Sequence, residues 1–431
     1  MNKKKIVYVP LAVDILHKGH INIIKIAKNY GRVIVGLLTD KAIVKYKELT
    51  ILNFEERKNL VKNLKYIDQV VAQDNYDYEE ILNRIKPNYF VHGDDWKFDN
   101  RKIVRKKVIK ILKKWNGRLI EPKYTKDVSS SIIKNKILEL SSTSNRVSRL
   151  KRLMDSKDIT RILESHNSLT GLIIENIKIN NNKKNLEFDG MWSSSLTDSA
   201  TKGLPDNSSL SFSARISSLN DMMDVTTKPI VFDADNGGQI EHLPFLIRSL
   251  ERSGASAIIM EDKVGLKKNS LFKNQAGTKQ DKPTLFAKKI KKICNTRQSQ
   301  DFMVIARIES FILGKGLKDA LHRAEIYSKA GADAILIHSK EKTPKEIFSF
   351  SKKFLKSKYY KPMIAVPSTY SKTYEKELIK NGFKIVIYAN QLMRAAYPAM
   401  KRTAEIILKS GRAFESEKSI AGINQVINLI K

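Results

Sequence analysis

Short apolar runs alternate with segments of helical spacing along residues 1–137. The expected strands are residues 6–9, 33–37, 69–72 and 89–92, and the expected helices are residues 20–28, 78–85 and 101–115. Strands that alternate with helices in this way favour a parallel sheet with helices on both faces. The pattern therefore predicts an α/β domain of the Rossmann-like type over residues 1–137.

A second alternation follows a small polar stretch at 141–145, which indicates a linker over residues 138–147. The expected strands are residues 171–174, 189–192, 230–233, 257–260, 304–306, 334–337, 363–366 and 385–388. Most are separated by helical segments such as residues 317–329. Eight strands with intervening helices in a chain of this length predict a (β/α)8 barrel over residues 148–431.

Polar residues fall at or just beyond the carboxyl ends of these barrel strands. They are Asp233, Asp235, Glu261, Arg307, Glu309, His338, Ser368 and Asn390. Barrel enzymes build their active sites at this end of the barrel, from residues at the ends of several strands. The pattern therefore predicts an active site there.

Four carboxylates converge on that rim: Asp233, Asp235, Glu261 and Glu309. Burying so much negative charge without compensation is prohibitive, so the sequence predicts a divalent cation. Oxygen ligands without a cysteine or histidine cluster favour Mg²⁺ or Mn²⁺ over zinc. Arg307 and His338 add a fixed cation and a titratable donor, which suit a small anionic substrate.

The composition is that of a soluble globular protein, with 42% hydrophobic and 29% charged residues. We expect no membrane span and no signal peptide, and the single cysteine, Cys294, fits a reducing cytoplasm. The net charge of +34 comes from lysines spread along the whole chain, without an arginine–aromatic stripe or a nucleic-acid motif. We therefore expect anionic small molecules as partners, and no nucleic acid.

Six motifs in the barrel region resemble those of the phosphoenolpyruvate mutases, a family of the isocitrate lyase superfamily of barrels. They are GMWSSSL (190–196), LPD (204–206), DADNGG (233–238), EDK with KKNS (261–263 and 267–270), ARIE (306–309) and IHSK (337–340). The resemblance runs from about residue 148 to the end of the chain, and implies conversion of phosphoenolpyruvate to phosphonopyruvate.

The resemblance also implies a role for each matched residue. Asp235 would be the main Mg²⁺ ligand, reached mostly through water, with Asp233, Glu261 and Glu309 around it. The substrate carboxylate would bind the amides of Ser194 and Leu196 beside Trp192, and the phosphoryl group would contact Arg307, His338 and Asn269. Asp206 would lie beside the reacting phosphorus, and Lys267 and Asn269 would belong to a loop that closes over the substrate.

Two related activities remain as alternatives on the same barrel: carbon–carbon lyase and phosphonopyruvate hydrolase. Lyases of the superfamily carry a catalytic cysteine in the loop after the EDK strand, and residues 264–269 contain none. Hydrolases lack the asparagine that matches Asn269, so its presence favours the mutase. Barrels of this family assemble with helices exchanged between subunits, which implies a homo-oligomer, either a dimer or a tetramer.

The amino-terminal domain carries its own set of motifs. HKGH (17–20) follows the first expected strand and opens a helix, and FEER (54–57), GDDW (93–96) and VSSSIIK (128–134) come later. Together they resemble cytidylyltransferases of the glycerol-3-phosphate type. The resemblance implies that His17 and His20 stabilise the transition state, that Arg57, Asp95 and Trp96 contact the nucleotide, and that Ser129, Ser130 and Ser131 bind the triphosphate with Mg²⁺.

The acceptor of the cytidylyl group stays open, because the family's first-strand TFD appears here as AVD (12–14). A barrel that makes a phosphonate, fused to a transferase that uses CTP, suggests a phosphonate acceptor. The alternative of another class is a basic binding protein whose amino-terminal domain has lost its activity. The intact HKGH and GDDW motifs favour a bifunctional enzyme.

Overall fold

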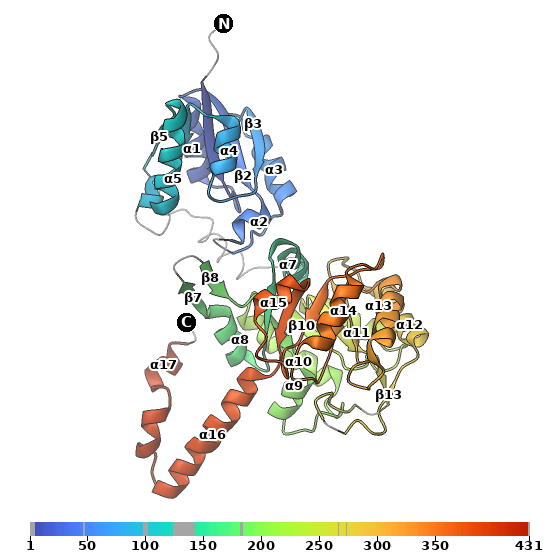
Figure 1. Cartoon of the computed structure of the whole chain (residues 1–431). Helices are drawn as coiled ribbons and strands as arrows, with labels where there is room; N and C mark the ends of the chain where they lie inside the picture. Colours follow the sequence, from blue (N-terminus) through green and yellow to red (C-terminus); the bar gives the residue numbers. More distant parts are fainter. Residues whose placement is uncertain are drawn as a thin grey trace. The chain divides into compact units, whose positions relative to one another are not determined.

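The computed structural model describes residues 5–45, 48–97, 102–123, 143–181, 184–265, 267–272 and 274–429, and the chain divides into two compact units (Figure 1). The first comprises Met1–Ser141 with Lys178–Leu186, and the second Ser142–Ile177 with Glu187–Lys431. Within the described residues, no helix combines the length and the apolar composition that crossing a membrane would need.

The first unit contains a five-stranded sheet in the order β3-β2-β1-β4-β5, and every neighbouring pair is parallel. Its strands are β1 (Ile6–Leu11), β2 (Arg32–Leu38), β3 (Gln69–Gln73), β4 (Tyr89–Val91) and β5 (Arg118–Ile120). Its helices are α1 (Lys18–Lys28), α2 (Asp40–Ile43), α3 (Phe54–Lys62), α4 (Glu79–Ile85) and α5 (Lys102–Leu112), with short 3-10 turns η1 (Asp94–Lys97) and η2 (Lys113–Trp115). The expected Rossmann-like architecture is confirmed, whereas β5, α2 and α3 were not predicted.

Helices cover both faces of this sheet, and successive residues of β1 point to opposite faces. Val7 and Val9 pack with residues of α1 and α3, while Tyr8 packs with residues of α4 and α5. The central strands β1 and β2 are therefore almost entirely apolar, which explains why they appear in the sequence as continuous runs.

The second unit is a closed barrel of eight parallel strands. In barrel order they are β6 (Thr160–Glu164), β9 (Gly190–Ser193), β10 (Ile230–Asp233), β11 (Ala257–Glu261), β14 (Met303–Ile308), β15 (Ala334–Ile337), β16 (Met363–Ala365) and β17 (Phe383–Tyr388). The helices are α7 (Thr143–Ser156), α8 (Ser168–Asn176), α9 (Ser195–Thr201), α10 (Phe212–Val225), α11 (Leu243–Ser253), α12 (Pro283–Thr296), α13 (Gly316–Lys329), α14 (Lys345–Phe354) and α15 (Glu375–Lys380). The predicted (β/α)8 barrel is confirmed.

One predicted barrel strand is wrong. Residues 171–174 lie in α8, and the first strand of the barrel is β6, ten residues earlier in the chain. A run of four apolar residues fits a strand or a buried helix equally well. Here Asn167 caps the helix by accepting a hydrogen bond from the Thr170 amide, and the pair forms a capping box that starts a helix.

The barrel interior is closed by α7, which precedes the first strand. Its Leu150 and Met154 belong to the same buried cluster as Ile162, Val231 and Ile259 of the strands. Because α7 begins at Thr143, residues 143–147 of the expected linker are helical. Residues 138–142 of that linker lie outside the described residues.

Two further two-stranded sheets are present: β7–β8 (Lys178–Asn181 and Lys184–Glu187), nearly all of which belongs to the first unit, and the antiparallel pair β12–β13 (Lys263–Val264 and Lys279–Gln280) of the barrel unit. The β12–β13 pair follows β11 directly. It therefore anchors a long loop at the carboxyl end of the barrel.

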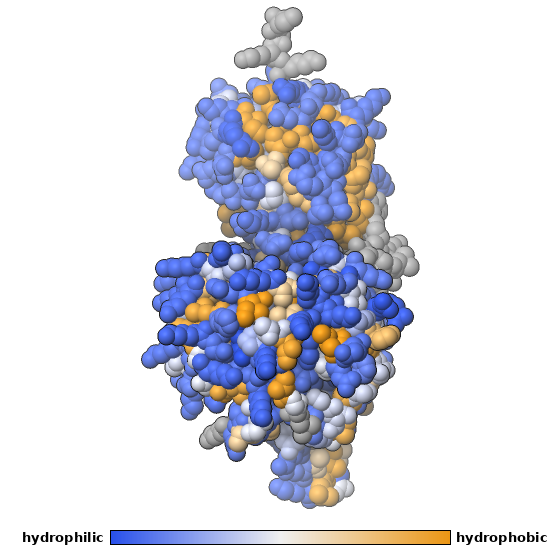
Figure 2. Space-filling view, turned by 90° about the vertical axis from the view of Figure 1, so that its right-hand side faces the viewer, coloured by the Kyte–Doolittle hydropathy of each residue, from blue (hydrophilic) through white to orange (hydrophobic). Residues whose placement is uncertain are grey.

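The chain ends in an arm made of α16 (Gln391–Ser410), η3 (Phe414–Ser419) and α17 (Ile423–Ile427), which projects from the barrel in Figure 1. No described residue of α16 or α17 is buried. The exposed apolar side chains of the arm are Tyr397, Met400, Ile407, Leu408, Phe414, Ile420, Ile423, Val426, Ile427 and Leu429. In Figure 2, the part of the arm that projects below the barrel shows hydrophobic residues along one side.

Candidate active sites

A cavity opens at the carboxyl end of the barrel, as predicted. Its lining includes Trp192, Ser194, Leu196, Asp206, Asp233, Glu261, Lys267, Asn269, Arg307, His338, Ser368 and Asn390, all named from the sequence, together with Ser195, Ser270, Leu271, Val366 and Ala389. Asp235 and Glu309 do not line it, but they contact residues that do. The structure thus brings the predicted barrel residues into one site.

Lys267 lies at the centre of one half of this site. Its ammonium lies 2.6 Å from Asp206 Oδ1 and also contacts Asp235 and the Ser195 hydroxyl. Asn269 donates from Nδ2 to Asp206 Oδ2 at 2.7 Å. Burial opposes the charge of Lys267, but the carboxylates, Asp235 first, raise its pKa, so this side chain stays a cation.

Asp233 and Asp235 reach this half from the end of β10. Asp235 adopts a left-handed backbone (φ 51°), and its amide donates to Asp233 Oδ1 at 3.1 Å. The Ser195 hydroxyl donates to Asp233 Oδ2 at 2.8 Å. Burial acts to raise the pKa of Asp233, yet Lys267, Arg307 and Arg215 together lower it to about 2. The carboxylate is therefore ionised at neutral pH.

The other half is a network of buried charges around Arg307. Its Nε donates to Glu309 Oε1 at 2.6 Å, and one of its terminal nitrogens lies 3.2 Å from Glu261 Oε2 and 3.0 Å from His338 Nδ1. The same nitrogen donates to the Ser270 hydroxyl at 2.8 Å, and Ser270 donates to Glu309 Oε2 at 2.5 Å. The network joins the ends of β11, β14 and β15 to the loop that follows β11.

Protonation states in this network diverge because each group has different neighbours. Burial and then the Arg307 charge lower the pKa of His338, which favours a neutral imidazole. Burial raises the pKa of Glu261 to about 7 against the opposing effect of Arg307. Burial also opposes ionisation of Glu309, but Arg307 and His338 hold the pKa of this carboxyl well below its usual range.

Buried oxygen donors fit the expected cation. The Oδ1 atoms of Asp206 and Asp235 are buried, and the positively charged Lys267 ammonium lies against both. Carboxylate oxygens are the ligands that Mg²⁺ takes in proteins, usually one or two of them with water. Across the described residues, no three His, Cys, Asp or Glu side chains are grouped closely enough to hold one ion directly.

Arg215, on α10, positions the ends of β9 and β10 and was not identified from the sequence. Its guanidinium is fully buried and donates to the Asp233 carbonyl at 2.5 Å, the Ser193 carbonyl at 3.3 Å and Asp198 Oδ2 at 2.9 Å. It also stacks 4.4 Å from the centre of the Phe232 ring. No motif marked this arginine, because its partners are backbone carbonyls and one helix carboxylate.

The amino-terminal site forms where α1 begins. His17 caps the helix, accepting at Nδ1 from the Gly19 amide at 3.1 Å, and His20 accepts at Nδ1 from the His17 amide at 3.4 Å. The two rings pack together with their centres 4.0 Å apart. Helix amino termini attract anions, so two imidazoles here suit a phosphate ligand.

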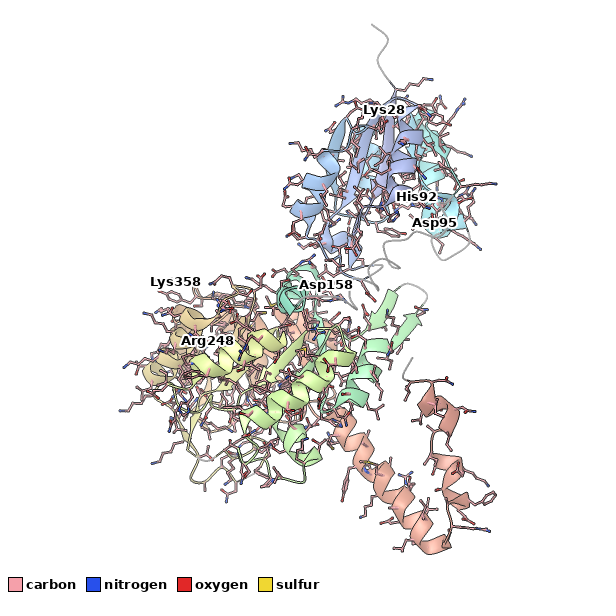
Figure 3. The ribbon with its side chains drawn as sticks, turned by 180° about the vertical axis from the view of Figure 1, so that it is seen from behind. Lys28, His92, Asp95, Asp158, Arg248 and Lys358 are labelled. Atoms are coloured by element: carbon pink, nitrogen blue, oxygen red, sulfur yellow. The ribbon has the colours of Figure 1, made fainter. Side chains whose placement is uncertain are left out.

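The carboxyl ends of β1 and β4 are neighbours, and the order of the sheet reverses between them, which is where open α/β sheets bind ligands. Asp95 follows β4, and its Oδ1 lies 3.8 Å from His92 Nδ1; Figure 3 labels both at the same end of the sheet. His92 was missed as a site residue, although it ends the predicted strand directly before the GDDW motif.

Trp96 and Arg57 lie in the interior of the fold. Trp96 is fully buried, stacks on His92 with ring centres 3.9 Å apart, and donates from Nε1 to Glu121 at 2.7 Å. It therefore supports the ring of His92 from within. Its direct contact with a nucleotide stays a prediction.

Arg57 is also fully buried and holds two loops of the amino-terminal unit together. It donates to the carbonyls of Ala12 at 2.6 Å and Leu38 at 2.9 Å, and it pairs with Asp40 at 2.6 Å. These contacts fix the loops that follow β1 and β2. Its role toward a nucleotide stays a prediction, and Ser129, Ser130 and Ser131 lie outside the described residues.

Comparison with known families matches both units. A model of the phosphoenolpyruvate phosphomutase family matches residues 150–408, and a model of the cytidylyltransferase-like family matches residues 13–136. The chain thus carries a cytidylyltransferase-like domain before its barrel.

Individual relatives match the barrel over nearly their whole length. Phosphoenolpyruvate phosphomutase of Tetrahymena pyriformis is 36% identical over 300 residues, which cover 69% of this chain and 95% of that protein. Phosphonopyruvate hydrolase of Variovorax sp. (strain Pal2) is 32% identical over 284 residues, covering 65% of this chain and 93% of that protein. The crystal structure of phosphoenolpyruvate phosphomutase from Streptomyces platensis subsp. rosaceus superimposes with a TM-score of 0.60 at 34% identity, covering 66% of this chain and 94% of that one.

Proposed function

Because the chain belongs to the phosphoenolpyruvate phosphomutase family, we propose that its barrel converts phosphoenolpyruvate to phosphonopyruvate. In this reaction the phosphorus–oxygen bond of the substrate breaks and a phosphorus–carbon bond forms at carbon 3 of the pyruvate enolate. The observation that carries the proposal is the pair Asn269–Asp206, joined at 2.7 Å inside the cavity beside the Lys267 ammonium.

Different residues of the cavity suit different parts of the substrate. The amides of Ser194 and Leu196 suit the carboxylate, with Trp192 beside it. Arg307, neutral His338 and Asn269 suit the phosphoryl group as donors, and positioning plus charge stabilisation is what phosphoryl transfer requires of a protein. Lys267, kept cationic by its carboxylate neighbours, balances the negative charge of the enolate.

Asp235 would be the main residue to hold Mg²⁺ in the proposed site, with the carboxylates of Asp233, Glu261 and Glu309 around it. When bound, the ion supplies positive charge against the oxygens of the substrate. Asp233, whose pKa is about 2, is already ionised at neutral pH, so it could interact with the cation without first losing a proton.

Phosphonopyruvate hydrolase is the second candidate, and Asn269 is the feature that argues against it. Water must be excluded in a mutase, since attack of water on phosphorus yields pyruvate and phosphate. The test is ³¹P NMR of the products from phosphoenolpyruvate and Mg²⁺, coupled to a phosphonopyruvate decarboxylase because the mutase equilibrium lies toward phosphoenolpyruvate. A phosphonate resonance supports the mutase, and inorganic phosphate alone overturns it.

We propose that the amino-terminal domain transfers cytidylyl groups from CTP to a phosphonate. His17 and His20, at the start of α1, suit the α-phosphate as pyrophosphate leaves. Incubation with CTP, Mg²⁺ and a panel that includes 2-aminoethylphosphonate and glycerol-3-phosphate tests the acceptor. Turnover of glycerol-3-phosphate alone contradicts a phosphonate acceptor, and no turnover with any acceptor contradicts the transferase.

We propose that the protein is a homo-oligomer in the cytoplasm. The exposed apolar side chains of the arm are a large surface to leave in water, and Leu408, 86% exposed, lies in its long helix. The single cysteine fits a reducing compartment. Light scattering after gel filtration tests the assembly: Leu408→Asp should lower the mass of the particle, and a monomeric wild-type protein contradicts the proposal.

A further inference from the structure

A single loop brings Lys267, Asn269 and Ser270 into the barrel cavity. It leaves the barrel at Asp262, directly after β11, and returns through β13 to Asp281. Between these points Lys263 pairs with Gln280 and Val264 with Lys279 in the short antiparallel ladder. The two ends of the loop therefore lie together, and whatever fixes them fixes the position of the residues between them.

The Asp262 carboxylate lies where these ends meet, and it is fully buried. Oδ1 accepts from the Glu309 amide at 2.9 Å. Oδ2 accepts from Tyr327 Oη at 2.8 Å, Gln280 Nε2 at 2.9 Å and Arg323 at 3.1 Å. Four hydrogen bonds fill the capacity of a carboxylate.

The four donors come from three different parts of the barrel. Glu309 follows β14, Arg323 and Tyr327 belong to α13, and Gln280 belongs to the returning end of the loop. The backbone reinforces the same joint: the Asp262 amide donates to the Arg307 carbonyl at 3.1 Å, and the Asp281 amide donates to the Asp262 carbonyl at 2.8 Å. Arg323 also donates to the Asp281 carbonyl at 2.8 Å.

Asp262 itself does not line the cavity. Its effect on the cavity is indirect: it holds the amide of Glu309, whose carboxylate pairs with Arg307, and it holds Gln280, which ends the loop. A carboxylate this deeply buried is costly unless fully hydrogen-bonded. The structural effect of the Asp262 carboxylate is therefore to fix the positions of the four groups that donate to it.

We infer that Asp262 is a positioning residue of the barrel reaction, which clamps both ends of the loop 263–279 to β14 and α13 and so holds Lys267 and Asn269 against Asp206. The inference rests on the proposed mutase function. It assigns the Asp262–Arg323–Tyr327–Gln280 cluster a role in product choice, although none of these four side chains touches the substrate site.

Displacement of the loop should let water react with the phosphoryl group. In the mutase reaction, the phosphoryl group leaves the enol oxygen and bonds to carbon 3 of the same enolate. If the loop is displaced, the oxygen of a water molecule bonds to phosphorus instead, the enolate takes a proton at carbon 3, and the products are pyruvate and phosphate. The ratio of phosphate to phosphonate therefore reports the position of the loop.

The test compares wild-type protein with Asp262→Asn, which keeps the shape of the side chain but turns one acceptor into a donor that faces other donors. We expect the phosphate share of the product, measured by ³¹P NMR, to rise about tenfold, as loss of a buried charged hydrogen bond implies. We also expect trypsin to cut at the lysines of loop 263–279 about tenfold faster, since the clamp no longer holds the closed loop.

Two further variants keep the test decisive. Tyr327→Phe removes the hydroxyl that donates to Asp262 and accepts from Arg323 at 3.0 Å, but it keeps the Asp262 carboxylate. It should therefore shift both readouts in the same direction by a smaller factor, and it serves if Asp262→Asn does not fold. Asp333→Asn is the matched control, because Asp333 also accepts from a backbone amide, that of Val304 at 2.8 Å, and from an arginine, Arg297, but it lies before β15 at the amino end of the barrel. It should leave the product ratio unchanged.

The outcomes separate the inference from the proposed function. If Asp262→Asn and Tyr327→Phe keep the wild-type product ratio and cleavage rate, the clamp is wrong. If they lower the melting temperature and both products in parallel with an unchanged ratio, the role is purely structural and the inference is also wrong. If wild-type protein forms no phosphonate, the mutase proposal fails, and the cleavage rate alone then decides whether Asp262 holds the loop.

Discussion

The two candidate sites of this chain both suit phosphate-bearing substrates, but they are built from different chemical groups. In the barrel, buried side chains of opposite charge contact one another directly, as in the groups around Arg307 and Lys267. In the amino-terminal unit, two half-buried imidazoles stand at a helix start, and backbone amides orient them. Buried ion pairs tolerate little change in geometry, whereas a helix terminus attracts any anion. The barrel site is therefore specific in its chemistry, and the amino-terminal site is general.

The largest expected effect is that of Asn269→Asp, which places a second carboxylate beside Asp206. Two like charges within hydrogen-bond distance repel each other and the phosphoryl group, so phosphonate formation should fall at least about a hundredfold. The measurement is ³¹P NMR in the coupled assay. Asn274→Asp, the same change at an exposed position of the same loop, should keep full activity, and an active Asn269→Asp would contradict the assigned site.

A comparable change in the other site is His20→Ala. Loss of the imidazole should lower pyrophosphate release from CTP about a hundredfold, the usual contribution of one such group. Phosphonate formation in the same preparation provides the control and should stay at the wild-type rate. A parallel loss of both activities would mean that the substitution damages the whole protein.

A smaller effect is expected from Arg215→Lys. An ammonium cannot reach the carbonyls of Asp233 and Ser193 and the Asp198 carboxylate together, so the ends of β9 and β10 should lose their fixed spacing. We expect kcat/KM for phosphoenolpyruvate to fall about tenfold. Arg248→Lys, at an exposed position of α11 labelled in Figure 3, is the control and should have no effect.

The smallest effect concerns acid stability of the amino-terminal unit. The hydrogen bond from Arg105 lowers the pKa of Glu121 to about 2, below its usual 4.5. Stability from this group is thus complete above pH 4.5 and is lost as the pH falls toward 2. Glu121→Gln should be less stable at pH 7 and should lose less stability between pH 4.5 and 2, as measured by urea unfolding followed by Trp96 fluorescence. Identical pH profiles would contradict the assignment.

Sequence patterns predicted the elements whose burial is uniform. Seven of the eight barrel strands and four strands of the open sheet, β1 to β4, lie where the apolar runs were expected to form strands. The first barrel strand, β6, was missed because its sequence TRILE begins with polar residues, while the apolar residues 171–174 are helical. Strand β5, of sequence RLI, was missed because only two of its residues are apolar and none is fully buried, whereas β4, of the same length, is apolar throughout.

Within the sites, family motifs located the residues that line the barrel cavity, since these depend on side-chain chemistry. Arg215 and Asp262 were not assigned roles, because both act through partners far away in the sequence, such as the Asp233 carbonyl and Arg323. Trp96 shows that a residue of a family motif can also have a structural role. It belongs to a motif, yet its indole is buried and supports His92.

The start of α16 has a mechanical consequence. Glu164, at the end of β6, accepts hydrogen bonds from the amides of Leu392 at 3.0 Å and Met393 at 3.4 Å, in the first turn of the arm helix. Asn390, one residue before that helix, lines the cavity. The arm helix thus begins one residue beyond the rim of the cavity, so a displacement of its first turn would move Asn390 and the end of β6 together.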